Sequence, residues 1–190
     1  MDLFKKLFGK KENDPPLTGE EAFLEAARLI SNDNSEAVEA VRYRLNHYEE
    51  FFAERISDFA CRGLSGDSEK GEVCLIAMIE VLIDFGCLRE FDRLDDSDEV
   101  LSGLRLLAEK LRLDYIPQMD LSFLDDGETV EDLEPERVFT LVAVNIDRYH
   151  QVVARLAIHG DSYIIGLMAF KAFQKCEAAL RGVGWEMQSY

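Results

Sequence analysis

Apolar side chains recur every three or four residues over much of the chain, which is the spacing of one face of an α-helix. This pattern predicts a first helix over residues 18–30, and Thr18 and Glu21 form a capping box that would start it. After a polar turn, the same spacing runs from Val38 to Phe59. It predicts one long amphipathic helix that ends near Gly63.

The run from Val73 to Phe85 is apolar on most sides, so its pattern fits either a buried helix or a buried strand. Its length favours the helix. Glu80 and Asp84 would then lie on one face, either as an acid and base pair or as a stripe exposed to solvent. A further helix is expected to begin at Ser97, because helical spacing returns after this residue.

In the last third of the chain, apolar residues show the helical spacing in some stretches and the alternation typical of strands in others. Pro135 fits the first turn of a helix, and two strands joined by a tight turn at residues 159–162 follow it. A helix that stops at Gly182 and a third strand through Trp185 close the chain, and a short strand is expected at residues 87–92. These elements predict an α+β fold. N-terminal helices should pack with a small, largely antiparallel sheet from the C-terminal half, and the helices that accompany the hairpin should lie on one face of this sheet.

The domain organisation follows from composition and pattern. Residues 1–17 read as a basic arm with a linker, and residues 18–190 as a single acidic α+β domain. Within that domain we expect a helical part (18–112), an irregular acidic segment (113–134) and a helix-hairpin-helix-strand module (135–190). A chain of 190 residues can bury a core of this kind without disulfide bonds.

The formal net charge of -17 comes from 38 acidic and 21 basic side chains. A surface of this charge repels phosphate, which excludes nucleic acid as an electrostatic partner and favours a basic protein. The charge is uneven, because residues 12–136 hold 33 acidic and 11 basic side chains, whereas residues 137–190 hold 4 and 6. A partner guided by charge should therefore meet the first of these regions rather than the strand near Trp185.

The first eleven residues, Met1–Lys11, carry a charge of +3, in contrast to the acidic remainder. On a helix their four large apolar side chains would share one face flanked by lysines. Such a segment is a loose tail or packing arm, or else an element that docks weakly on an anionic membrane or a partner. The apolar residues are Leu3, Phe4, Leu7 and Phe8.

The cysteines indicate a reducing compartment. Cys61, Cys74, Cys87 and Cys176 lack the two-residue gap of a zinc knuckle or redox motif, so we interpret them as reduced core thiols. The sequence shows no secretory signal and no run of about 18 apolar residues that would span a membrane. We therefore expect a cytoplasmic protein without a transmembrane segment.

The sequence His-Gly-Asp-Ser at residues 159–162 resembles the nucleophile block of the GDSL-type esterases. In that family a later Asp-x-x-His block supplies the base. No histidine follows Ser162 here, so a base would have to come from His47, His150 or His159. A hairpin turn explains the glycine and Asp161 completely.

A cluster of carboxylates follows the short strand at residues 87–92. Such a cluster could bind a hard cation, but its spacing does not match an EF-hand loop, and Asp96 with Glu99 has the form of a helix cap. No Gly-rich phosphate loop or two-histidine motif occurs, so we expect neither a metal nor a cofactor. The cluster consists of Asp92, Asp95, Asp96, Asp98 and Glu99.

Two stretches resemble an uncharacterised bacterial family of unknown function. The first is CLREFDRLDDSDEV, in which an Asp-rich turn follows a short strand. The second is LAIHGDSYIIGLM, in which Ser-Tyr follows a hairpin turn. The resemblance covers about residues 70–190 and implies no activity.

Three functions stay open at this point. The first is a non-enzymatic cytoplasmic protein-binding module, such as an acidic neutraliser of a basic partner, and the lack of a catalytic constellation favours it. The second is a hydrolase that uses Ser162 or the acidic cluster, and the third is a peripheral membrane adaptor attached through residues 1–11. The candidate interaction or site residues are Asp92, Asp95, Asp96, Asp98, Asp161 and Ser162.

Overall fold

The computed structural model describes residues 17, 19–55, 70–158 and 161–190, which form helices and one sheet. The helices are α2 (Gly19–Ile30), α3 (Ser35–Asn46), α4 (Tyr48–Glu54), α6 (Lys70–Asp84), α7 (Ser97–Lys110), α8 (Pro135–Asp147) and α9 (Phe170–Arg181). The strands are β1 (Arg89–Asp92), β2 (Gln151–Leu156), β3 (Ser162–Ala169) and β4 (Met187–Ser189). The predicted α+β class is confirmed.

The four strands form one antiparallel sheet in the order β1-β3-β2-β4. β2 and β3 are the predicted hairpin, paired from Gln151 opposite Ala169 to Leu156 opposite Ile164. β1 pairs with the free side of β3, and β4 pairs with the free side of β2. Three of the four strands thus come from residues 151–190, although β1 joins them from the middle of the chain.

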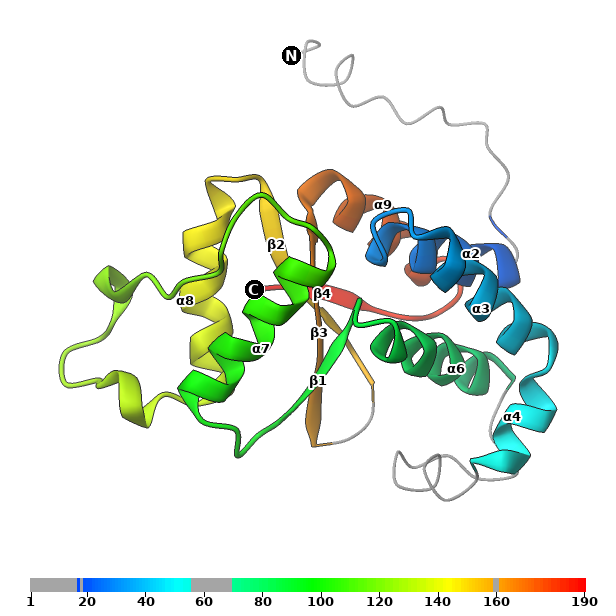
Figure 1. The fold of residues 1–190 in the computed structure, drawn as a ribbon, viewed down its shortest axis with the longest axis horizontal. Helices are drawn as coiled ribbons and strands as arrows, with labels where there is room; N and C mark the ends of the chain where they lie inside the picture. Colours follow the sequence, from blue (N-terminus) through cyan, green and yellow to red (C-terminus); the bar gives the residue numbers. More distant parts are fainter. Residues whose placement is uncertain (1–16, 18, 56–69, 159–160) are drawn as a thin grey trace, which may run out of the picture.

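Helices cover both faces of this sheet, so the expectation of helices on a single face was wrong. α7 and α8 form one layer, and α2, α3, α6 and α9 lie on the other side of the strands (Figure 1). The central strand β3 is accordingly buried from Tyr163 to Met168, with apolar side chains that point to both layers. Such a run needs cover on each face, because side chains alternate along a strand.

The long helix predicted from Val38 onward is two helices in the described residues. α3 ends at Asn46 and α4 begins at Tyr48, with His47 between them at φ −122° and ψ 32°. The His47 ring stacks on Tyr43, and its Nδ1 lies 2.8 Å from the Tyr43 carbonyl oxygen. A break of one residue leaves the apolar spacing intact, so the pattern did not reveal it. The predicted continuation beyond Arg55 lies outside the described residues.

The buried run at residues 73–85 is a helix, as its length indicated. α6 is covered on nearly all sides, with residues such as Met78 and Leu82 fully buried. The carboxylate of Glu80 binds the Arg55 guanidinium at 3.0 Å. No described helix is long and apolar enough to cross a bilayer.

The strand predicted through Val183 and Trp185 begins later than expected. α9 ends at Arg181 as predicted, but Gly184 then adopts a left-handed conformation (φ +87°) that turns the chain. Pairing starts only at Met187. Trp185 is half-buried and packs against the core. Between α7 and α8 the chain has only two short 3-10 turns, η1 (Leu121–Phe123) and η2 (Val130–Asp132).

Candidate functional site

The acidic cluster at residues 92–99 organises its own backbone. Asp92 accepts a hydrogen bond from the Leu94 amide at 2.9 Å, and Asp95 accepts one from the Asp92 amide at 3.0 Å. Asp96 and Glu99 form the predicted capping box at the start of α7. Across the described segments, no three His, Cys, Asp or Glu side chains gather as metal ligands would. The cluster is thus a turn and a helix cap.

Ser162 opens β3, where it lies opposite Asp92 in the register. Its hydroxyl donates a hydrogen bond to the Glu90 carboxylate, while Asp161 is exposed and 3.9 Å from Arg93. These contacts join β1 to β3 at the surface.

The structure does not bring an imidazole from its described residues to Ser162. His150 directly precedes Gln151, which pairs with Ala169 at the far end of β3. Ala169 lies seven residues along the strand from Ser162, or about 24 Å. His47 lies between α3 and α4, where it stacks on Tyr43. His159 and Gly160 of the predicted turn lie outside the described residues.

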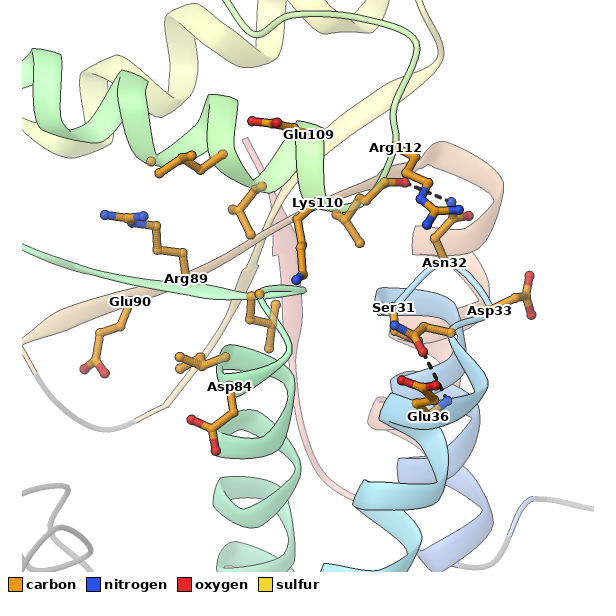
Figure 2. Close-up of a pocket in the computed structure, with 18 of the residues that line it drawn as sticks. Ser31, Asn32, Asp33, Glu36, Asp84, Arg89, Glu90, Glu109, Lys110 and Arg112 are labelled. Carbon is orange, nitrogen blue, oxygen red and sulfur yellow. Dashed lines mark hydrogen bonds between the residues drawn. The ribbon is translucent and has the colours of Figure 1, made fainter.

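A hollow of about 1180 Å³ lies between the α2–α3 turn, the α6–β1 connection and the end of α7 (Figure 2). Asn32 closes one side, because its side-chain amide donates to the Leu111 carbonyl at 3.2 Å. Four residues of its lining have left-handed backbone conformations. Three of them are not glycine, which is unusual for L-residues. They are Asn32 (φ 54°), Asp33 (φ 61°), Gly86 (φ 69°) and Arg112 (φ 54°).

The charges of this hollow are mixed. Lys110 occupies its middle, where its stem lies against Gly86 at the end of α6 and its ammonium suits the negative end of that helix. Two arginines and five carboxylates surround it, and the lining contains neither His nor Cys. The combination selects no single class of ligand and contains no catalytic constellation. The charged residues are Asp33, Glu36, Asp84, Arg89, Glu90, Glu109, Lys110 and Arg112.

An acidic segment lies beside α8. Residues 113–136 contain nine carboxylates and no lysine or arginine. Three contacts hold this segment against α8: Tyr115 stacks on Tyr149 at 5.4 Å between ring centroids, the Asp120 amide donates to the Leu141 carbonyl at 3.1 Å, and Arg137 donates to the Phe123 carbonyl at 2.7 Å. The segment therefore runs antiparallel to the helix.

Arg137 fixes the tip of the segment. Its guanidinium also binds Asp125 at 3.0 Å and Glu128 at 2.9 Å. The hydrogen bond from Arg137 lowers the pKa of Glu128, and the hydrogen bond from the Ser122 hydroxyl lowers the pKa of Asp120. These carboxylates consequently remain charged at neutral pH.

Large apolar side chains are exposed among these charges. Of the ten exposed large apolar residues in the described chain, five lie between residues 116 and 149. Ile116 is 68% exposed, Leu121 49% and Phe123 54%. The three contacts that anchor the segment reach from Arg137 to Tyr149. The surface is therefore about 18 Å long. We call it the α8 strip, made of Ile116, Leu121, Phe123, Val144 and Tyr149 with the carboxylates of residues 113–136.

Neither the hollow nor the α8 strip was found from the sequence. The hollow combines three distant segments that share no motif. The strip lies in a region that the sequence identified only as irregular and acidic. The large apolar residues between its carboxylates could have indicated an exposed binding surface.

The three described cysteines, Cys74, Cys87 and Cys176, are free and buried, as predicted. Burial raises the pKa of Cys74, that of Cys87 to about 11 and that of Cys176 to about 12. Such thiols are poor nucleophiles and poor metal ligands. Cys61 lies outside the described residues.

Comparison with known proteins bears on the predicted resemblance to an uncharacterised family. A family model described as a domain of unknown function, DUF6630, matches residues 22–190. No curated protein and no solved structure matches the chain. The match covers most of the chain and extends well before residue 70, where the resemblance seen in the sequence began. The chain therefore belongs to the DUF6630 family, whose function is unknown.

Proposed function

We propose that this protein is a non-enzymatic protein-binding module that captures a basic partner through the α8 strip. The observation that carries this proposal is the combination of nine carboxylates, no basic side chain and three exposed large apolar residues in one segment, residues 113–136. Nucleic acid is a poor partner for such a surface, since both carry negative charge.

The carboxylates and the exposed apolar residues would have different roles in binding. Carboxylates attract a basic protein from a distance and speed its association, but exposed ion pairs add little affinity. Affinity in protein interfaces comes mainly from a few buried apolar or aromatic residues, a role that Ile116, Leu121 and Phe123 suit. Arg137 holds the segment in shape before binding, so less entropy is lost when the partner docks.

The hydrolase alternative has weaker support. Ser162 donates to a carboxylate, and no imidazole of the described residues lies beside it. The described lining of the hollow likewise offers no nucleophile and base pair. Buried, free thiols are typical of a reducing compartment, which supports a proposed cytoplasmic location for the binding function.

Capture of basic proteins from a native lysate at low salt tests the proposal. The strip variant carries Asp114→Lys, Asp126→Lys and Glu131→Lys, three exposed residues that make no ion pair within the described chain. The control carries Glu20→Lys, Glu50→Lys and Glu186→Lys, which change the net charge equally on other exposed positions. We expect the parent and the control to retain the same basic protein and the strip variant to lose it.

Two results would contradict the proposal. One is that the parent reproducibly retains no basic protein at low salt. The other is equal retention by all three proteins, which would mean that bulk charge rather than the α8 strip attracts the partner. Far-UV circular dichroism of the variants checks that each one is folded.

A further inference from the structure

The chain contains a segment whose chemistry complements the α8 strip. Residues 1–11, which lie outside the described residues, carry four lysines and one aspartate around four large apolar side chains. The strip offers the converse set, with exposed apolar residues among carboxylates. Charge complementarity and apolar contact are the two features of a helix laid in a surface groove. The apolar residues of the arm are Leu3, Phe4, Leu7 and Phe8.

We propose that the α8 strip binds residues 1–11 of a second copy of the chain. The dimensions agree, because eleven residues span about 17 Å as a helix and the strip is about 18 Å long. The three anchors of the strip place Ile116 near one end of α8, Leu121 near its middle and Phe123 near its start. An amphipathic arm of about three turns can thus meet an apolar residue at three places along the strip.

The arrangement of the layers explains why a second copy supplies the arm. α2, to which the arm is tethered, lies in the helical layer on the opposite side of the sheet from α8 (Figure 1). Packed layers are about 10 Å apart, so the two helices lie about 20 Å apart through the protein and farther around its surface. The tether, residues 12–18, reaches at most about 24 Å when extended. This reach leaves little excess over the separation through the protein, and the path around the surface is longer, so we assign the arm to a second copy rather than to its own α8.

Reciprocal exchange of arms would give a closed dimer with two equivalent contacts. This inference concerns the same surface as the proposed function but needs no external partner. A basic partner would compete with the arms for the strip, so capture and self-association would exclude each other.

Sedimentation velocity of the full-length chain tests the inference. We expect a dimer at low salt whose dissociation constant rises at least tenfold on Phe123→Ser and on the arm double variant Phe4→Ser/Phe8→Ser. Leu94→Ser is the matched control, since Leu94 is 92% exposed on the β1–α7 turn and is not a residue of the strip. It should dimerise like the parent. A synthetic peptide of residues 1–11 should convert the parent dimer to monomer.

Charge exchange provides a second, independent readout. Lys5→Glu/Lys6→Glu should abolish the dimer, and adding Asp126→Lys/Glu131→Lys in the same chain should restore it, because both sides of the contact are then reversed. A restored dimer also shows that the single-side variants were folded. Failure of the restoration contradicts direct contact between the arm and the strip.

Other outcomes overturn the inference and leave the proposed function intact. A parent that is monomeric at low salt, or a dimer unaffected by Phe123→Ser, excludes exchange of arms through the strip. If Lys5→Glu/Lys6→Glu instead abolishes flotation with phosphatidylserine vesicles and does not alter the dimer, the arm is a membrane-docking element. Capture of a basic partner that depends on the strip, by a chain that never dimerises, supports the proposed function alone.

Discussion

Gly103 allows α7 to lie close against β1. A β-carbon added at this position would be 2.5 Å from Cε1 of Phe91 and 2.7 Å from Nε of Arg89. Arg89 is exposed and can move, but Phe91 is 1% exposed and packs edge-on against Phe139. The absence of a side chain on one helical residue therefore sets the distance between a helix and the sheet.

Gly103→Ala should lower the free energy of unfolding by about 1–3 kcal/mol, as expected when an extra methyl group forces a packed core to shift. The gain in helix propensity, at most about 1 kcal/mol, offsets only part of this loss. Urea denaturation followed by circular dichroism measures the difference. Gly71→Ala in α6 is the control, because nothing lies within 4 Å of its added carbon, and it should be neutral or slightly stabilising.

The buried thiols should react slowly with iodoacetamide at pH 8. Burial raises the pKa of Cys87 to about 11 and that of Cys176 to about 12, so their thiolate fractions fall to about one hundredth or less of those of an exposed thiol. Peptide mass spectrometry of the native protein and of the protein in urea measures each rate. Equal rates in the two states would show that the thiols are accessible in the folded protein.

At the level of elements, α7 depends on its N-terminal cap. The Asp96 carboxylate accepts a hydrogen bond from the Glu99 amide at 2.8 Å, and the Glu99 carboxylate accepts one from the Asp96 amide at 3.4 Å. Each bond satisfies an amide that has no partner within the helix. The acidic cluster is therefore explained by local structure.

Asp96→Ala should destabilise the fold by about 1 kcal/mol, the usual effect of removing a helix N-cap. Thermal unfolding followed by circular dichroism measures it. Asp126→Ala removes the same charge from an exposed turn and should change stability by less than about 0.5 kcal/mol. Similar losses in both variants would mean that charge, not the cap, is responsible.

The tip of the irregular segment beside α8 is held by Arg137. Arg137 binds the Phe123 carbonyl, Asp125 and Glu128, and thereby closes the loop that contains η1. A segment with so few internal backbone hydrogen bonds is held by such side-chain contacts rather than by regular backbone hydrogen bonding.

Arg137→Ala should speed hydrogen exchange at residues 121–128 at least tenfold, because these amides open locally once the clamp is removed. Exchange in α6 and in the sheet should not change. Mass spectrometry of deuterated peptides separates the two regions. Arg42→Ala, which removes only an exposed pair with Glu39 on α3, is the control and should leave residues 121–128 as slow as in the parent.

For the whole molecule, net charge opposes the compact state. A chain of formal charge -17 repels itself, and salt screens this repulsion more than it weakens the few exposed ion pairs. The near-neutral module at residues 137–190 does not compensate, since it contributes only two positive charges. Stability should therefore depend on ionic strength.

Raising sodium chloride from about 0.01 M to about 1 M shortens the screening length from about 30 Å to about 3 Å. We expect the melting temperature at pH 7 to rise by about 2–4 °C, equivalent to roughly 1 kcal/mol for a chain of this size. Differential scanning calorimetry measures the shift. At pH 4.5, the isoelectric point of the sequence, the repulsion is absent, and salt should have no such effect. A fall in melting temperature with salt at pH 7 would show that ion pairs dominate.

The sequence by itself determined the features that neighbouring residues encode. The length of the apolar run identified α6, Asp96 and Glu99 marked the start of α7, and Gly182 marked the end of α9. The sequence also predicted the hairpin of β2 and β3 and the uneven distribution of charge. Each of these depends on periodicity or capping within a few residues, which the linear sequence contains in full.

Only the tertiary structure decided the break at His47, the covering of both sheet faces and the two surface sites. The break preserves the apolar period, so no pattern marks it. The hollow is closed by the hydrogen bond from Asn32 to Leu111, which are 79 residues apart. The α8 strip depends on the stacking of Tyr115 on Tyr149. Such contacts join segments that lie far apart in the sequence, so no local periodicity predicts them. They form only when the whole core packs.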